Sequence, residues 1–526
     1  MSTYHYSVND DKKTLILLGQ LLAAVPAGAI ATLSFAPYDY AFIAPLTLIL
    51  FLFLLQKQSP KRSALIGFFY GLGMFGTGIS WVHVSIDTFG GMPKIASMFL
   101  MVLLISYLAL YPALFGYLFN RFNRQRPFHQ LLLSGPVIWL LLDWIRGWLF
   151  TGFPWLWMGY SQLNTPLAHF APILGVEGIT LALMLISGSI VATIYYRNWR
   201  PLLVAILVAI LAILAGIPQW VKPDPKHSVT VALIQGNISQ EEKWLPSHRW
   251  PTLMKYMDLT RDNWGSDLII WPEAAIPALE EDIPTFLQNL DAAARANNST
   301  VITGILDQKA DGEFFNNILT LGVDADGPYN YNTATRYTKH HLLPFGEFVP
   351  FASILRPLAP FFNLPMSSFS RGAYIQPNIQ AHGYSIAPAL CYEIAFGEQI
   401  RENITKETEL LLTLSNDAWF GRSIGPFQHM QIAQMRALEF GKPLLRGTNT
   451  GITAVVDHNG HITKELPQFV TGVLKDKVIP TIGMTPYTTL GSWPLYGYCL
   501  WALALSWLLI RRKRGHFRDL RPTEKE

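Results

Sequence analysis

Long apolar runs separated by short polar breaks fill residues 14–221, and one more covers residues 493–510. Residues 222–491, between them, show the mixed polar and apolar pattern of an ordinary globular domain. A helix needs about 20 mainly apolar residues to cross the hydrocarbon core of a bilayer. The pattern therefore predicts eight membrane-spanning helices, near residues 15–33, 41–55, 64–83, 95–119, 131–150, 167–195, 202–220 and 493–510.

Composition supports this interpretation. The 526 residues are 50% hydrophobic and only 14% charged, whereas soluble proteins carry about 25% charged residues. Buried core helices of a large soluble protein are the alternative, but so many apolar runs in so weakly charged a chain argue against it. The first run is followed directly by others without a cleavage site, which is typical of a retained anchor. The first two runs could also form a tight hairpin through residues 36–39.

Basic residues predict the orientation of the helices. Cytoplasmic loops carry an excess of Lys and Arg, and the basic residues cluster at every second loop, at positions 12–13, 57–62, 121–126, 197–200 and 511–514. Both termini are therefore expected in the cytoplasm, with the globular segment on the far side, which is the periplasm in a bacterium. Lys94 and Arg146 are the exceptions, at span ends from which long side chains could reach water.

Charge and cysteine content exclude several functional classes. With 40 Lys and Arg against 36 Asp and Glu, the net charge of +4 is too balanced to indicate nucleic-acid binding. Cys391 and Cys499 are too few for a disulfide framework or a four-cysteine zinc site. His340 and His341 are adjacent and lack an accompanying carboxylate cluster, so neither a metal nor a cofactor is expected.

The globular segment has the alternation of strands and helices that is typical of an α/β layered domain. Expected strands cover residues 229–235, 267–271, 299–306, 318–323, 384–390 and 409–414, and expected helices cover 284–296 and 426–440. Functional groups gather at the carboxyl ends of strands in such folds.

Three reactive side chains follow or lie near such strand ends. Glu273 follows the strand 267–271, Cys391 follows the strand 384–390, and Lys339 lies in the segment 336–347. A thiol reacts only as a thiolate, so it needs a base or a cation beside it, and a lysine could stabilise an oxyanion. Taken singly, each has an ordinary alternative: a buried small apolar Cys, a solvated Glu or a surface Lys.

The sequence around these residues resembles a known family. Trp271-Pro-Glu-Ala-Ala, Lys339-His-His-Leu-Leu-Pro-Phe-Gly-Glu347 and Cys391-Tyr-Glu393, in this order, resemble the Glu–Lys–Cys signature of the nitrilase superfamily. Asn416-Asp-Ala-Trp-Phe-Gly421 and Arg446-Gly-Thr-Asn-Thr-Gly451 fit the same pattern. With apolar runs in front, the chain is similar over nearly its full length to the apolipoprotein N-acyltransferase family.

The resemblance implies an architecture. It is a multi-span α-helical membrane bundle of eight transmembrane helices, joined to a nitrilase-like αββα sandwich on the periplasmic side of the bacterial inner membrane. The expected domains are a seven-span bundle at residues 1–222, a catalytic domain at 223–489, and a final transmembrane helix with a basic cytoplasmic tail at 490–526.

The resemblance also implies a two-step acyl transfer. Cys391, deprotonated by Glu273, attacks an acyl ester of a phospholipid, with phosphatidylethanolamine as the expected donor. The α-amine of a diacylglyceryl-cysteine at an apolipoprotein's N-terminus then attacks the resulting thioester. Lys339 stabilises the oxyanion in both steps. Glu347 matches the family's second glutamate and orients Lys339 or the base, with a purely structural salt bridge as the alternative.

Further residues are expected around this site. The resemblance implies that Tyr392 and Glu393 shape the pocket and that Trp244 and Trp419 lie near it, although plain core packing would also account for the tryptophans. Residues 348–369 contain four prolines, yet they are too apolar for a solvated loop. They are predicted to form a lid at the membrane surface, represented by Phe361 and Phe362, and a loop folded back onto its own domain is the alternative.

Two rival functions stay open at this point. One is a membrane-tethered amidase or nitrile hydrolase that uses the same triad on a small soluble substrate. The other is a lipid or lipoprotein carrier in which Cys391 only packs. Capture of an acyl chain on Cys391 would indicate the transferase, and release of ammonia would indicate the hydrolase.

Overall fold

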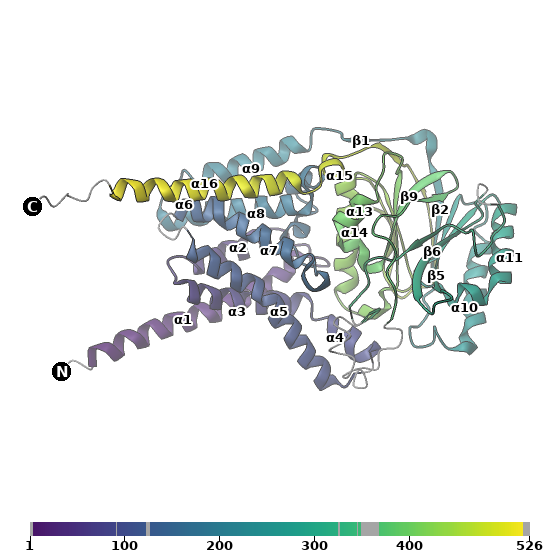
Figure 1. Ribbon diagram of the computed structural model, residues 1–526, viewed down its shortest axis with the longest axis horizontal. Helices are drawn as coiled ribbons and strands as arrows, with labels where there is room; N and C mark the ends of the chain where they lie inside the picture. Colours follow the sequence, from purple (N-terminus) through teal and green to yellow (C-terminus); the bar gives the residue numbers. More distant parts are fainter. Residues whose placement is uncertain are drawn as a thin grey trace, which may run out of the picture. The chain divides into compact units, whose positions relative to one another are not determined.

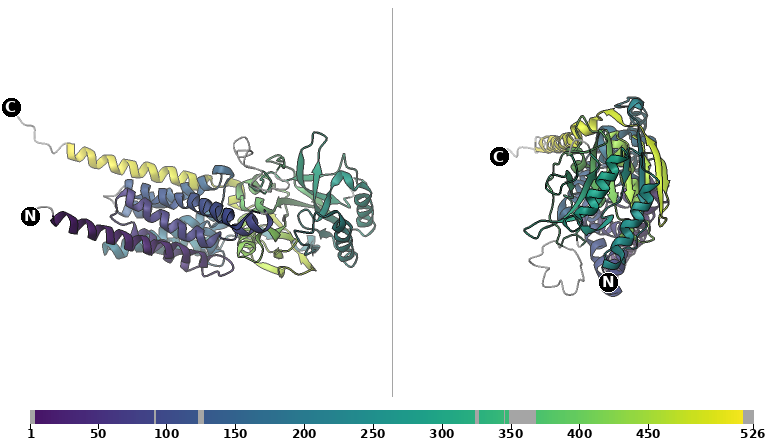
Figure 2. Two further views of the ribbon diagram at one scale, coloured as in Figure 1. Left: turned by 90° about the horizontal axis from the view of Figure 1, so that it is seen from below. Right: turned by 90° about the vertical axis from the view of Figure 1, so that its right-hand side faces the viewer.

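The computed structural model describes residues 4–90, 92–122, 127–323, 327–344, 346–348 and 368–518. The chain divides into two compact units. The first comprises residues 1–80, 99–218 and 492–526, and the second comprises residues 81–98 and 219–491. The first unit is helical, and the second is built mainly from large β-sheets with flanking helices (Figures 1 and 2).

A helix lies at each predicted span. These helices are α1 (Tyr4–Ala31), α2 (Ile43–Leu54), α3 (Pro60–Gly78), α5 (Lys94–Arg121), α7 (Gly135–Arg146), α8 (Ala171–Tyr196), α9 (Leu202–Ala215) and α16 (Trp493–Arg518). Among the described residues, four stretches are long and apolar enough to cross a membrane: Thr14–Ser34, Lys94–Arg121, Pro127–Arg146 and Pro166–Tyr196. A fifth is added if Pro60–Gly78 and Val82–Phe89, bent by 60°, form one span.

Several helices are shorter than their apolar runs. Helices α2 and α9 have 12 and 14 residues, against the roughly 20 that a straight span needs. Helix α9 ends at Ala215, because Gly216 and Pro218 follow it. Helix α3 begins at Pro60, where the Ser59 hydroxyl accepts a hydrogen bond from the backbone N–H of Arg62, and it ends at Gly78. The chain bends after Gly78, so the prediction of one continuous helical span over residues 64–83 was wrong.

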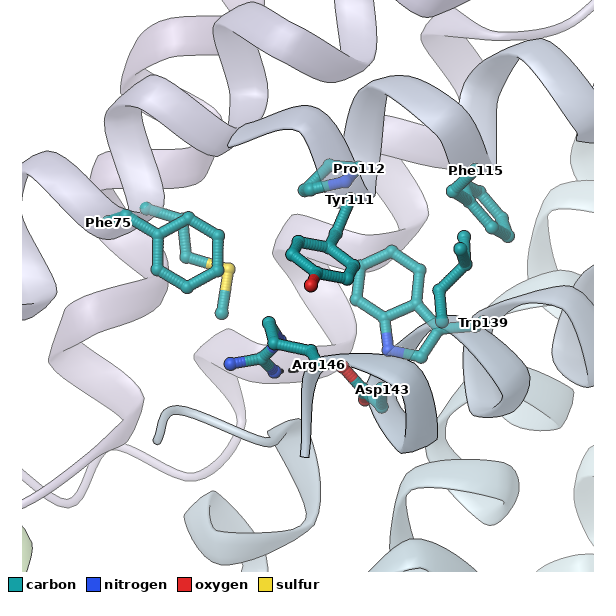
Figure 3. A pocket seen from close by; sticks show the side chains of 9 residues that line it. Phe75, Tyr111, Pro112, Phe115, Trp139, Asp143 and Arg146 are labelled. Carbon is teal, nitrogen blue, oxygen red and sulfur yellow. Dashed lines mark hydrogen bonds and ion pairs between the residues drawn. The ribbon is translucent and has the colours of Figure 1, made fainter. Parts of the chain in front are cut away.

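The expectation that Arg146 extends to water was also wrong. Its side chain is buried and donates to Asp143 Oδ1 at 2.8 Å and to the carbonyl oxygens of Phe153 and Trp155. Both charged groups line a small cavity in the helical unit, with Tyr111 beside them (Figure 3). Arg146 is buried because the loop that follows α7 folds back and supplies the carbonyl acceptors.

Besides a two-stranded sheet of β1 (Val221–Pro223) and β15 (Thr481–Gly483), the second unit contains two large sheets. One has the order β14-β2-β3-β5-β6-β7, with β4 paired to β5, and the other has the order β13-β12-β11-β10-β9-β8. The strands of the first sheet are β2 (Val229–Gln235), β3 (Leu268–Ile270), β4 (Ile276–Leu279), β5 (Thr300–Gln308), β6 (Phe314–Leu321), β7 (Arg336–Thr338) and β14 (Gly472–Val478). Those of the second are β8 (Ile379–Ala381), β9 (Tyr384–Leu390), β10 (Leu410–Ser415), β11 (Leu444–Thr448), β12 (Thr453–Val456) and β13 (Ile462–Leu466).

The two sheets pack face to face through one apolar core. Leu233 and Ile270 from the first sheet share it with Leu390 and Leu412 from the second. The opposite face of the first sheet is covered by α10 (Pro246–Arg261) and α11 (Pro284–Ala296), which bury Leu253 and Leu287 among others. Helices α13 (Gly397–Glu402) and α14 (Gly425–Phe440) lie against the second sheet (Figure 1). The unit is therefore a four-layer αββα sandwich.

The parallel strands bring their carboxyl ends to one edge of each sheet. Strands β2, β3 and β5 are parallel in the first sheet, and β9, β10 and β11 are parallel in the second. Strands buried on both faces read as mainly apolar runs, as Leu268–Ile270 and, apart from Thr413 and Ser415, Leu410–Ser415 do. The residues that follow β3, β9 and β10, together with Lys339 after β7, form the candidate site.

Candidate active site

The loop after β3 fixes the backbone of Glu273. The buried Trp271 donates its backbone N–H to the carbonyl oxygen of Ile302 at 2.8 Å, which continues the pairing of β3 with β5. Gly304 on β5 lets the loop pass closely, because a Cβ there would lie 2.4 Å from the Ala274 nitrogen and 2.7 Å from the Glu273 Cα. Glycine is therefore required at this close approach.

Three neighbouring elements hold the Glu273 carboxylate. Oε1 accepts from Asn316 Nδ2 at 2.9 Å and from Lys339 Nζ at 3.3 Å, and Oε2 accepts from the backbone N–H of Asn416 at 3.0 Å. The residue is only 7% exposed. These contacts fix the carboxylate in place, and a carboxylate is a group that can act as a general base.

Lys339 lies directly after the short strand β7. Its backbone N–H donates to Asn316 O at 2.8 Å, so pairing with β6 sets the position of the side chain. The ammonium lies 2.8 Å from Glu347 Oε1 as well as 3.3 Å from Glu273. Burial alone would lower the pKa of Lys339, but the carboxylates of Glu273 and Glu347 raise it well above the ordinary value. Lys339 is thus a fixed cation in a site shielded from water.

Glu347 contacts the lysine more closely than the candidate base does. Its Oε1 also accepts from Asn316 Nδ2 at 3.2 Å, and its Oε2 accepts from the backbone N–H of Leu343 at 2.8 Å. Glu347 therefore anchors the ammonium and the side chain of Asn316 together.

Cys391 lies at the turn where β9 ends. Its backbone φ is +52°, a left-handed conformation that is uncommon for a residue with a side chain. The sulfur lies 3.4 Å from Ser415 Oγ at the end of the neighbouring strand β10. Burial and the Glu273 carboxylate raise the pKa of the Cys391 thiol, and the Lys339 cation partly offsets this. The resting thiol is neutral, so it needs a base at the moment of attack.

Glu393 connects the Cys391 turn to the end of β7. Its fully buried carboxylate accepts from the Tyr337 hydroxyl at 2.9 Å and from the backbone N–H of Leu390 at 2.8 Å. The same carboxylate accepts from the backbone N–H groups of His340 and His341 at 2.8 and 2.9 Å. Glu393 thereby fixes the backbone on either side of the candidate nucleophile and cation.

The remaining predicted residues lie in different surroundings. Tyr392 is buried, with its ring 5.0 Å edge-on from the ring of Phe396. Trp419 is half-buried and meets the Phe89 ring at 5.6 Å, whereas Trp244 is 36% exposed. Phe361 and Phe362, the predicted lid residues, lie outside the described residues.

Sequence reasoning missed two polar neighbours of Glu273. Asn316 has no local signal, because it acts only through the pairing of β6 with β7. Lys243 is 2% exposed and donates to the backbone carbonyl of Glu273 at 3.3 Å. Burial lowers the pKa of Lys243 to about 8, although the charge of Glu273 acts in the opposite direction. A loop lysine is ordinarily exposed, so its sequence context gave no indication of this role.

The fold and the site define a class of protein. Residues 230–484 match the carbon-nitrogen hydrolase family. A solved carbon-nitrogen hydrolase from Helicobacter pylori G27 is similar at 14% identity with a TM-score of 0.38, covering 51% of this chain and 94% of that one.

Matches to the helical part and to full-length relatives identify the family to which the chain belongs. Residues 27–189 match the apolipoprotein N-acyltransferase N-terminal domain. The apolipoprotein N-acyltransferase of Photobacterium profundum is 72% identical over 98% of this chain and all of its own length, and that of Vibrio cholerae is 59% identical over 94% and 97%. The chain belongs to the apolipoprotein N-acyltransferase family. It is a membrane acyltransferase that N-acylates lipoproteins during their maturation.

Proposed function

We propose that this enzyme moves an acyl chain from phosphatidylethanolamine to the α-amine of a diacylglyceryl-cysteine through a thioester on Cys391. The observation that carries the proposal is the shared site of Glu273, Lys339 and Cys391. The first two lie 3.3 Å apart, and the charges of both act on the Cys391 thiol.

The first half-reaction forms the thioester. The Cys391 sulfur bonds to the carbonyl carbon of the phospholipid ester while Glu273 takes the thiol proton. The carbonyl electron pair moves to oxygen, and the Lys339 ammonium stabilises that oxyanion. When the tetrahedral intermediate collapses, the bond to the glycerol oxygen breaks. The proton held by Glu273 then goes to that oxygen, so a lysophospholipid leaves and the carboxylate is restored.

The second half-reaction uses the same groups. The neutral α-amine attacks the thioester carbonyl carbon, Glu273 accepts the proton from the amine nitrogen, and Lys339 again faces the oxyanion. Collapse breaks the carbon–sulfur bond, leaves an amide, and returns the sulfur to Cys391 with the proton from Glu273. Burial of Glu273 and Lys339 limits the access of water to the thioester between the steps.

The membrane arrangement forms part of the proposal. Eight transmembrane helices would span the bacterial inner membrane, with both termini in the cytoplasm and the catalytic domain in the periplasm. The domains would be residues 1–222, 223–489 and 490–526, with residues 81–98 packed in the catalytic unit. The clustering of basic residues at alternate loops supports this orientation.

A single-turnover experiment tests the proposal. Enzyme in detergent is mixed with phosphatidylethanolamine and no acceptor peptide, and lysophospholipid is counted per enzyme. A burst of one equivalent is expected, followed by continued release only after a diacylglyceryl-cysteine peptide is added. Steady release without the peptide would indicate a hydrolase, and release that requires the peptide from the start would contradict a thioester intermediate.

A further inference from the structure

A buried polar cluster contacts Cys391 and has no role in the steps above. Its members are Ser415 at the end of β10, Asp417 in the short 3₁₀ helix η12 (Asp417–Phe420), His429 on α14 and Arg446 on β11. All are at most 1% exposed. Arg446 Nη2 donates to Asp417 Oδ2 at 2.7 Å, and this ion pair holds the pKa of Asp417 far below its ordinary value although burial opposes it.

The cluster reaches the Cys391 backbone through His429. The imidazole Nε2 lies 3.1 Å from the carbonyl oxygen of Cys391, and Nδ1 lies 3.1 Å from both Arg446 Nη2 and Asp417 Oδ1. Burial and the Arg446 cation lower the pKa of His429, which favours the neutral ring. A neutral ring satisfies the carbonyl of Cys391 only when Nε2 carries the hydrogen, and Nδ1 then accepts from Arg446.

Ser415 contacts the sulfur itself. Its hydroxyl has one hydrogen and two possible partners, Asp417 Oδ1 at 2.6 Å and Cys391 Sγ at 3.4 Å. The charge-assisted bond to the carboxylate is the stronger, so the hydrogen goes to Asp417. The Ser415 oxygen is then left to accept a hydrogen bond from the neutral thiol.

We propose that His429 and Ser415 are positioning residues for Cys391. His429 holds the carbonyl of the left-handed turn, whose φ is +52°, and Ser415 holds the sulfur. Asp417 fixes the hydroxyl hydrogen of Ser415, and Arg446 fixes the ring hydrogen of His429 on Nε2. This inference rests on the proposed function, in which Cys391 is the nucleophile. It assigns the strained turn to a defined network of hydrogen bonds that reaches both the carbonyl oxygen and the sulfur of Cys391.

Two substitutions at one position test the tautomer. The amide of His429→Gln can place a donor where Nε2–H lies and an acceptor where Nδ1 lies, whereas the shorter amide of His429→Asn reaches only toward Asp417. Acyl-enzyme formation from phosphatidylethanolamine is timed in a single turnover, and the thermal unfolding midpoint is measured for each variant. We expect His429→Asn to be slower by about 100-fold, the loss that a displacement of about 1 Å produces. His429→Gln should recover most of the rate.

Equal rates for His429→Asn and wild type, or no recovery in a folded His429→Gln, would overturn the role of His429. Ser415→Ala gives a second measure, because it removes only a hydroxyl. It should slow acyl-enzyme formation by about tenfold, the worth of one hydrogen bond, with the apparent affinity for phospholipid unchanged. An unaltered rate would overturn the role of Ser415. Failure of wild type to form a thioester on Cys391 would instead overturn the proposed function.

Discussion

The Lys339 ammonium donates a 2.8 Å hydrogen bond to Glu347, so a second carboxylate holds this cation more closely than the candidate base does. With two carboxylates beside it, Lys339 keeps its charge although burial opposes it. The arrangement leaves the Lys339 cation shared between them, and it predicts a specific effect of removing either charge.

Glu347→Gln should impair acyl-enzyme formation although Glu347 takes no proton in the mechanism. When Glu347 has lost its charge, the Lys339 ammonium pairs more tightly with Glu273. Glu273 is then a weaker base toward the thiol proton. We expect a decrease of about tenfold to 100-fold, because a hydrogen bond to a charged group is worth about 1.5–3 kcal/mol and about 1.4 kcal/mol is a factor of ten. A single-turnover measurement checks this, and an unchanged rate in a folded variant would leave Glu347 with a structural role alone.

Glu273→Gln should abolish most acyl-enzyme formation. The amide preserves an acceptor for Lys339 but cannot take the thiol proton, and general-base catalysis contributes about 10²–10⁴-fold. Glu281→Gln is the matched control, since Glu281 is exposed on the following segment. The assigned role of Glu273 is wrong if the variant builds up thioester at the rate of the control.

Lys339→Met should slow both half-reactions, because each passes through an oxyanion. Loss of one such donor costs about 10²–10³-fold. The second step can be timed separately by adding acceptor peptide to preformed acyl-enzyme, and the exposed Lys406→Met serves as the control. A defect confined to one step would contradict a shared oxyanion site.

Local patterns predicted most of the strands and helices around the site. Strand β9 and helix α11 have the predicted bounds 384–390 and 284–296, and β3 differs by one residue at each end. Strand β9 and helix α11 are long and β3 is strongly apolar, so the local pattern of apolar residues determines all three. Strand β7, three residues long, was not predicted, because only its pairing with β6 makes it a strand.

The residues of the candidate site also fall into two groups, those that local sequence indicated and those that only tertiary packing brings there. Glu273, Lys339 and Cys391 stand in recognisable strings, so the sequence pointed to them directly. The groups that hold them do not: Asn316, Lys243 and His429 reach the site through tertiary packing, from positions 43, 30 and 38 residues away from their partners. The sequence also did not indicate that the Glu393 carboxylate accepts from backbone N–H groups on both sides of the site.

Lys243 predicts a pH dependence of stability. Its pKa is about 8 in the folded protein and about 10.4 when unfolded. Below pH 8 both states hold the proton and the cost of burying the charge is fully present. As the pH rises above 8, the folded state loses the proton first, so folding gains about 3 kcal/mol by the time the unfolded lysine titrates.

Lys243→Met lacks this titration. Between pH 8 and 10 the thermal unfolding midpoint of wild type should therefore rise relative to that of Lys243→Met, while Lys406→Met should follow wild type. Parallel midpoints for all three proteins would show that Lys243 does not carry a buried charge.

The identity of the nucleophile is the central claim, and mass spectrometry of the purified protein after incubation with phosphatidylethanolamine tests it most directly. The account predicts the mass of one acyl chain on the peptide that contains Cys391, removable by hydroxylamine. The adduct should be absent in Cys391→Ala and present in Cys499→Ala, since Cys499 is a buried residue of α16. An adduct on Cys499, or full lipoprotein acylation by Cys391→Ala, would contradict the account.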